Sequence, residues 1–218
     1  MREKLLELYN SRKIDFEYID KNCTVKVNGP FLLSPTEMYS RQPNPLLIIG
    51  QETNGFCKNE KDLEKRMDCY EKFGSGIEYN RKSSPFWNVT RKIEKILGDE
   101  EYSCAWTNIS KYDQENKTPS LENTKFISKV DNLLIEEINI LKPKVCIFYT
   151  SYKFDLRIQN IFNEVEFISI PEFEKKQVCQ LKHAALPELT FRTYHPGYLR
   201  RKKLLIEGFL KLVETIVK

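Results

Sequence analysis

Three polar side chains whose chemistry could combine on one ligand each follow a short apolar stretch: a carboxylate (Glu52), an amide (Asn108) and an imidazole (His195). A short continuous apolar run is typical of a buried strand in a parallel sheet. Ligands of such sheets bind beyond the carboxyl ends of the strands, so we expect these three side chains at one edge of the molecule. A carboxylate can orient water and stabilise positive charge, and an imidazole can stabilise developing negative charge. An amide offers a donor and an acceptor to a planar ligand.

His195 lies in the most distinctive run of the chain, residues 193–203, and is one of only two histidines. Pro196 and Gly197 follow it, and both interrupt regular structure. The run ends with two bulky residues and four cations: Tyr198, Leu199, Arg200, Arg201, Lys202 and Lys203. Such cations can contact phosphate groups. Taken alone, however, a basic run is compatible with a solvated helix start, and a lone histidine with a structural role.

Residues 50–55 form a polar loop bounded by two glycines, and glycine lets a backbone approach a ligand closely. The sequence has neither a dinucleotide-binding fingerprint nor a P-loop, which argues against a nucleotide-binding hydrolase. In isolation the loop is equally compatible with an ordinary turn. Asn108 is compatible with a turn or cap residue, and Phe86 with core packing.

Composition narrows the class of protein. The net charge is +4 and 40% of the residues are hydrophobic, which suits a packed core and does not by itself indicate nucleic acid. No apolar run is long enough to cross a bilayer and no signal peptide is evident, so we expect a soluble, cytoplasmic protein. The six cysteines are scattered, without a Cys-x-x-Cys pair or a Cys/His cluster, so we expect no metal and no other cofactor.

The elements that must position these residues alternate between strands and helices. Apolar runs predict strands at 46–50, 103–109, 145–149 and 189–194, and extended structure at 14–34. Helical spacing predicts helices at 2–10, 58–72, 85–97, 122–141, 153–162 and 204–217. This alternation predicts a three-layer α/β/α fold with a central four-stranded parallel sheet. Residues 165–181 predict a small hairpin insertion. We expect a single domain over residues 1–218, with residues 1–40 packed on its core, and a monomer.

Several short motifs, in order along the chain, resemble those of the uracil-DNA glycosylase superfamily, most closely its iron–sulfur branch. Residues 193–200 resemble Thr-Tyr-His-Pro-Ser-Tyr-Leu-Leu-Arg, and residues 50–54 resemble the Gly-Gln-Asp-Pro-Tyr-His motif of the classical enzymes. Residues 107–111 resemble a Thr-Asn-Val-Val-Lys strand end, and residues 85–86 a Pro-Phe pair before a helix. Residues 142–145 resemble the passage into the third strand.

The chain departs from these motifs in ways that bear on cofactor and substrate. Tyr112 stands where the iron–sulfur branch has a cysteine, so the resemblance implies no cluster here. Thr53 replaces the proline of the first motif. Asn54 replaces a tyrosine that blocks bulk at the pyrimidine C5 position, so a base larger than uracil could enter. Gly197 replaces the usual serine, which makes the turn more flexible.

The resemblance implies a DNA glycosylase that flips a deaminated or modified pyrimidine out of DNA and hydrolyses its bond to the sugar. His195 would stabilise the leaving base, and Glu52 the sugar cation and the attacking water, although the sequence leaves open whether Gln51 or Glu52 faces the sugar. Base-binding residues would be Gln51, Asn54, Phe86 and Asn108. Tyr198 and Leu199 would fill the gap in the duplex, next to the flexible Gly197, and residues 200–203 would hold phosphates.

Two alternatives remain open from the sequence. The enzyme could act on a hypermodified cytosine of phage DNA, as an anti-phage defence, instead of repairing uracil. Alternatively, the protein could be a non-catalytic DNA-binding protein on the same fold, since fold does not imply function.

Overall fold

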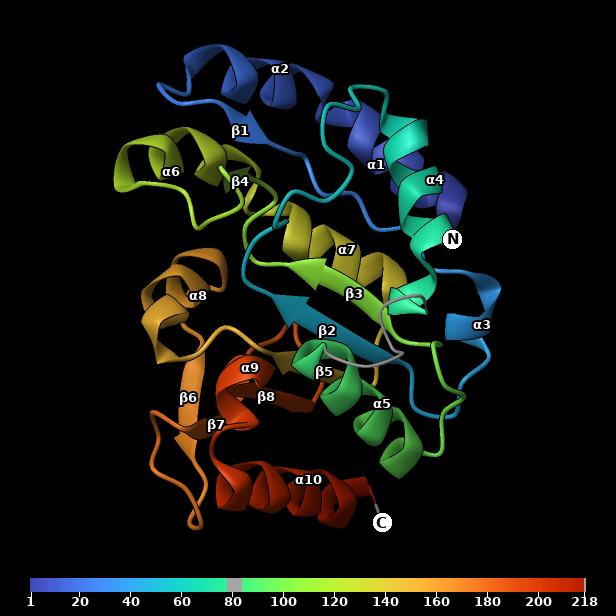
Figure 1. Cartoon of the computed structure of the whole chain (residues 1–218), viewed down its shortest axis with the longest axis vertical. Helices are drawn as coiled ribbons and strands as arrows, with labels where there is room; N and C mark the ends of the chain where they lie inside the picture. The colour runs from blue at the N-terminus through green and yellow to red at the C-terminus, as the bar shows by residue number, and fades with distance from the viewer. Residues whose placement is uncertain (78–83, 218) are drawn as a thin grey trace.

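The computed structural model describes residues 1–77 and 84–217 and is built around a mixed six-stranded sheet (Figure 1). The strands of this sheet are β2 (Leu46–Gly50), β3 (Ala105–Asn108), β5 (Val145–Phe148), β6 (Glu166–Ser169), β7 (Val178–Lys182) and β8 (Leu189–Thr193). Their order is β3-β2-β5-β8-β7-β6, and the first four are parallel neighbours. Their carboxyl ends therefore meet at one edge, where the candidate side chains were expected.

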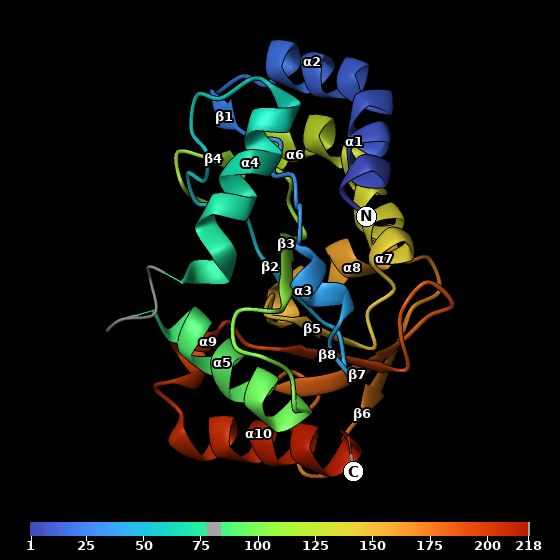
Figure 2. The ribbon, with the colours of Figure 1, turned by 90° about the vertical axis from the view of Figure 1, so that its right-hand side faces the viewer.

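Helices connect these strands and cover both faces of the sheet (Figure 2). The helices are α1 (Arg2–Ser11), α2 (Lys13–Asn22), α3 (Glu37–Ser40), α4 (Leu63–Phe73), α5 (Pro85–Leu97), α6 (Leu121–Ile127), α7 (Leu133–Leu141), α8 (Asp155–Ile161), α9 (Pro196–Leu199) and α10 (Lys203–Val217). Short 3₁₀ turns lie at η1 (Gly74–Gly76), η3 (Ser128–Val130) and η4 (Tyr152–Phe154). None of the helices within the described residues is long and apolar enough to span a membrane.

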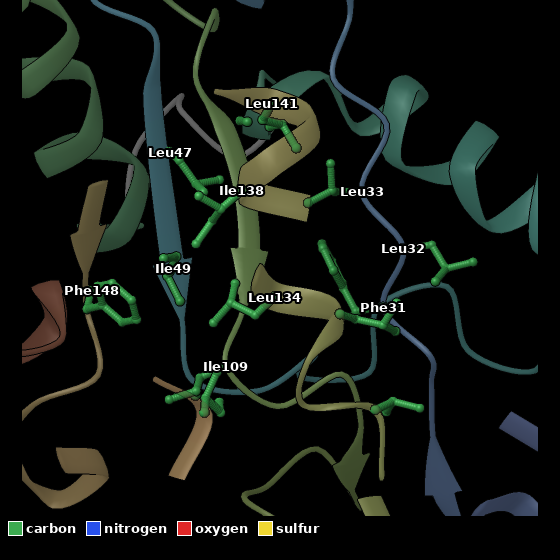
Figure 3. Packing of buried hydrophobic residues seen from close by; sticks show 14 of the residues in the cluster. Phe31, Leu32, Leu33, Leu47, Ile49, Ile109, Leu134, Ile138, Leu141 and Phe148 are labelled. Carbon is green, nitrogen blue, oxygen red and sulfur yellow. The ribbon is translucent and has the colours of Figure 1, made fainter. Parts of the chain in front are cut away.

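The two faces of the sheet bury two separate apolar clusters. Successive strand residues point to opposite faces, so Leu47 and Ile49 of β2 join one cluster and their neighbours join the other. Figure 3 shows Ile138 of α7 beside Leu47, within the first cluster. Helices α5 and α10 cover the opposite face, where Ile93 and Phe209 are fully buried. Burial of each such side chain contributes about 1.5–3 kcal/mol.

The sheet differs from the expected one in size and direction. The hairpin expected at residues 165–181 is present as β6 and β7, but it is not a separate insertion. Strand β7 pairs antiparallel with β8 and thereby extends the parallel strands into a mixed sheet. The main-chain groups of β8 that face away from β5 are thus hydrogen-bonded to β7. The sequence pattern of the hairpin alone does not reveal this pairing.

Two predicted elements were wrong in part. Residues 13–22 form helix α2 instead of extended structure, because Phe16 and Ile19, three residues apart, are buried together on one helical face. Ile14, which suggested strand alternation, is 80% exposed. The single helix expected at 122–141 is divided into α6, η3 and α7.

A second, two-stranded sheet lies beside the first motif loop and was not predicted. Strand β1 (Val27–Asn28) pairs antiparallel with β4 (Asp113–Gln114), across 85 residues of sequence for the Asn28–Asp113 pair. Each strand has only two residues, which is too short for a periodic pattern to show.

Candidate functional site

The polar residues predicted from the strand ends meet in one cavity of about 670 Å³ at the carboxyl edge of the sheet. All six predicted catalytic and base-binding residues line it: Gln51, Glu52, Asn54, Phe86, Asn108 and His195. They come from the loop after β2, the first turn of α5, the end of β3 and the second residue after β8. A volume of this order lies within the range of small-ligand sites.

Asn108 is the last residue of β3 and lies opposite Gly50, the last residue of the neighbouring parallel strand β2. Its side chain is 1% exposed, and its amide nitrogen Nδ2 is buried without a hydrogen-bond partner. A buried, unpaired amide donor is costly and indicates a ligand that would accept from it. Gly50 is needed for this placement, because a Cβ there would lie 2.3 Å from Asn108 Oδ1.

His195 is held in one orientation and one tautomer. It caps helix α9, and its Nδ1 accepts a hydrogen bond from the Gly197 amide at 3.1 Å. Burial lowers the pKa of His195, so the imidazole is neutral at neutral pH. With Nδ1 acting as acceptor, the proton resides on Nε2. His195 therefore offers a fixed N–H donor and no positive charge.

Glu52 is half-buried and is the second residue of the loop after β2. Its Oε2 accepts a hydrogen bond from the Thr118 hydroxyl at 3.0 Å. Burial raises the pKa of Glu52, the negative charge of Asp113 adds to this rise, and the Thr118 bond opposes it. This carboxylate therefore takes up a proton more readily than an exposed glutamate as the pH falls.

The first motif loop is anchored by a buried residue that sequence reasoning missed, Asp113 of β4. Its Oδ2 accepts from the Thr53 hydroxyl, from the Gly55 amide at 2.7 Å and from Asn28 Nδ2 at 3.1 Å. Its Oδ1 accepts from the Asn116 amide at 2.8 Å. Two of these bonds hold Thr53 and Gly55, the first and third residues after Glu52 in the loop. The sequence does not identify Asp113, because its partners in the loop, Thr53 and Gly55, lie about 60 residues away along the chain.

The remaining predicted base-binding residues differ in how freely they face the cavity. Gln51 donates its amide Nε2 to the Thr150 carbonyl at 3.2 Å, which ties the loop to the segment that follows β5. Asn54 is exposed, in a left-handed conformation with φ of 50°. The Phe86 ring lies 5.9 Å from the His195 ring, centre to centre, and packs edge-on against Tyr149.

Aromatic side chains form the rest of the cavity wall and were also not predicted. Phe56, Phe73, Trp87 and Trp106 all line it. Trp106 packs against each of the other three, with ring centres about 5.5 Å apart. Its indole Nε1 is buried without a hydrogen-bond partner. The wall is thus apolar on one side, with one free donor, and suits a planar ligand.

The segment after His195 divides into a buried and an exposed part. Tyr198 is 42% exposed, and Arg200, Arg201, Lys202 and Lys203 are exposed. Leu199, in contrast, is fully buried. The expectation that Leu199 contacts DNA does not fit this placement, because helix α9 turns its side chain into the protein. Gly197 binds His195 through its amide, and a Cβ at this position would lie 3.2 Å from His195 Nδ1.

Within residues 1–77 and 84–217, no three His, Cys, Asp or Glu side chains are grouped so that they could hold a metal ion. No protein-family model matches the sequence, and no curated protein matches it. The fold and the cavity therefore define the chain only as an α/β protein with a polar and aromatic site at the carboxyl edge of its sheet.

Proposed function

We propose that the protein is a DNA glycosylase of the uracil-DNA glycosylase type, which removes a pyrimidine base from DNA and leaves an abasic site. One observation carries the proposal: Glu52, Asn108 and a neutral His195 line a single cavity together with the Phe86 ring. The glycosylase motifs that the sequence resembles contain residues of these types in the same order along the chain.

The base would enter this cavity only after leaving the duplex stack, which costs a few kcal/mol. Stacking on Phe86 offsets part of that cost, at about 1–3 kcal/mol per base. Asn108 would then pair with the polar edge of the ring. Its buried, unpaired Nδ2 would find there the acceptor that the protein itself does not supply.

In the reaction, the bond between base N1 and sugar C1′ breaks and both electrons move to the base. Negative charge develops on the base, and the Nε2–H of His195 is a donor suited to stabilise it. The neutral imidazole suits this task, because it donates this hydrogen bond without first taking up a second proton, which burial opposes. Glu52, ionised, stabilises the positive sugar and accepts a proton from the water that attacks C1′. The departed base anion takes its proton from solvent.

A second candidate substrate is a pyrimidine with a substituent at C5, such as a hypermodified cytosine of phage DNA. The observation that favours it is Asn54, which is exposed and places no ring across this part of the cavity. Such an activity would fit defence against phage, whereas release of uracil would fit repair. Single-turnover reactions on uracil, mismatched and 5-substituted duplexes, followed by alkali cleavage at abasic sites, distinguish the two.

The test of the proposed chemistry uses Glu52→Gln and His195→Ala. Each substitution is expected to lower the rate of base release by about 10²- to 10³-fold, since each removes one charge-stabilising group. The matched control is His183→Ala, because the His183 Nδ1 likewise accepts a backbone amide two residues ahead, at 3.1 Å, outside the cavity. Base release at the unsubstituted rate in both variants would refute the mechanism. Binding to every DNA without formation of abasic sites would favour a non-catalytic DNA-binding protein.

A further inference from the structure

Three tyrosines from separate segments form a row on the surface beside the candidate site. Tyr152 lies in η4, Tyr194 follows β8, and Tyr198 lies in α9. The Tyr194 and Tyr198 ring centres are 4.5 Å apart, and those of Tyr152 and Tyr194 are 6.2 Å apart. Tyr152 is 45% exposed and Tyr198 42%. Tyr152 and Tyr198 thus each pack against Tyr194 while a large part of their own surface faces solvent and is open to a ligand.

A groove of about 670 Å³ adjoins this row and includes Tyr194 and Tyr198 in its lining. The other residues that carry charge there are Glu172, Glu174, Lys176, Arg201, Lys202 and Lys203. Cations thus outnumber carboxylates by four to two in the groove. One carboxylate is already engaged, since Glu174 pairs with Lys176 at 2.8 Å. The groove therefore favours an anionic ligand.

Basic and aromatic groups are also interleaved along the row. Lys176 and Arg201 line the groove together with Tyr194 and Tyr198. A ligand that lies on these rings would therefore meet an ammonium group beside them. Polymers that combine flat rings with a regular negative charge are nucleic acids, and only unpaired bases expose the ring faces needed for stacking.

The groove and the first cavity are lined by neighbouring residues of one short segment. Tyr194 precedes His195, which lines that cavity, and Tyr198 follows it by three residues. A DNA strand that placed one nucleotide in the first cavity would pass over this segment. Its neighbouring nucleotides would then lie at the tyrosine row.

We propose that the tyrosine row and its basic groove form a binding site for single-stranded nucleic acid, on which unpaired bases next to the flipped nucleotide stack. The direction of the strand rests on the proposed function, but the binding itself requires no base removal. Duplex DNA without a flipped base would use only the cations. The site therefore predicts a preference for single-stranded over fully paired DNA.

The test measures fluorescence anisotropy of a labelled, unmodified single-stranded oligonucleotide and of the same sequence as a duplex. Tyr152→Ala is expected to weaken single-strand binding by roughly 5- to 150-fold, the range found for loss of one stacking ring. Tyr152→Phe retains the ring and should retain wild-type affinity. Tyr18→Ala is the matched control, because Tyr18 is also 40% exposed and packs against the Phe126 ring in another part of the protein.

Three results would overturn the inference: unchanged single-strand affinity in Tyr152→Ala, an equal loss of affinity for duplex, or equal competition by polyglutamate. The last result would show a site for any acidic polymer, including an acidic protein. Base release assayed in parallel separates this inference from the proposed function. Tyrosine-dependent binding without any base release refutes only the glycosylase, and base release with tyrosine-independent binding refutes only the single-strand site.

Discussion

Replacement of the buried carboxylate that anchors the first motif loop, Asp113→Asn, should change both the stability and the pH dependence of this protein. Asp113 is fully buried, and its two oxygens accept four hydrogen bonds. An amide of the same size has one oxygen. If that oxygen keeps the three bonds of Oδ2, the amide nitrogen faces the Asn116 N–H, donor against donor.

The cost can be worked from these contacts. A hydrogen bond to a charged group contributes about 1.5–3 kcal/mol, and one such bond, to Asn116, is lost outright. The other three become bonds to a neutral acceptor, which are roughly half as strong. We therefore expect the free energy of unfolding, measured in urea, to fall by about 4–7 kcal/mol. The loop that carries Glu52 loses its anchoring in the same step, so the rate of base release should fall as well.

The pH profile separates an electrostatic role from a merely structural one. Burial and the charge of Asp113 raise the pKa of Glu52, so removal of that charge lowers this pKa. Base release requires ionised Glu52 in the proposed mechanism and is lost as the pH falls through its pKa. The acid limb of the rate profile should consequently move to lower pH in Asp113→Asn. The Thr118 hydroxyl, which donates to Glu52, is neutral, and His195 lines the same cavity.

The assay is single-turnover base release as a function of pH, alongside urea unfolding. Asp99→Asn is the control, because Asp99 is a buried carboxylate that accepts a backbone amide, from Asn44 at 3.0 Å, and does not line the cavity. It should lower stability without moving the limb. If the acid limb of the Asp113→Asn rate profile stayed in place or moved to higher pH, the electrostatic argument would be refuted. If the free energy of unfolding of this variant were unchanged, the anchoring argument would be refuted.

Two further substitutions test the placement of the site and its support. Gly50→Ala introduces a Cβ 2.3 Å from Asn108 Oδ1 and should displace that amide. The rate of base release is then expected to fall by about 10²-fold. An unchanged rate would show that Asn108 does not act in base binding. Glu137→Gln removes the charge that pairs with the buried Lys111 and accepts from Tyr9; urea unfolding should show a loss of about 3–5 kcal/mol, and a loss below about 1 kcal/mol would show that the pair is dispensable.

The parallel strands and the edge they form could be predicted because buried parallel strands are continuous apolar runs. Residues 46–49 have no exposed position, and the structure confirms β2 there. Helix α2 was missed because Ile14, Phe16 and Tyr18 alternate as a strand would, while only Phe16 of the three is buried. Periodicity over so few residues does not separate the two structures until long-range packing decides.

The candidate site was predictable in its residue types but not in its support. Glu52, Asn108 and His195 follow from strand ends, and the structure brings them to one cavity. Asp113 and Thr118 do not follow, since they act across 58 and 66 residues of sequence on Gly55 and Glu52. The aromatic wall was hidden for another reason. Rings such as Trp106 are half-buried and are compatible with ordinary core packing until the fold shows that they line a cavity.

Residues that could be predicted from the sequence and residues that could not meet in the loop at 50–55, which we propose selects the substrate. In the motif that residues 50–54 resemble, a proline restricts the backbone directly through its ring. Here Thr53 stands in its place and is held by its hydroxyl to Asp113. Asn54 and Gly55 follow with positive φ of 50° and 75°, and the Gly55 amide donates to the same carboxylate. At Thr53 and Gly55 the loop is therefore held by one buried acceptor. That acceptor also raises the pKa of Glu52, so the geometry of the loop and the charge that we propose acts in catalysis are coupled through Asp113 and should change together when it is substituted.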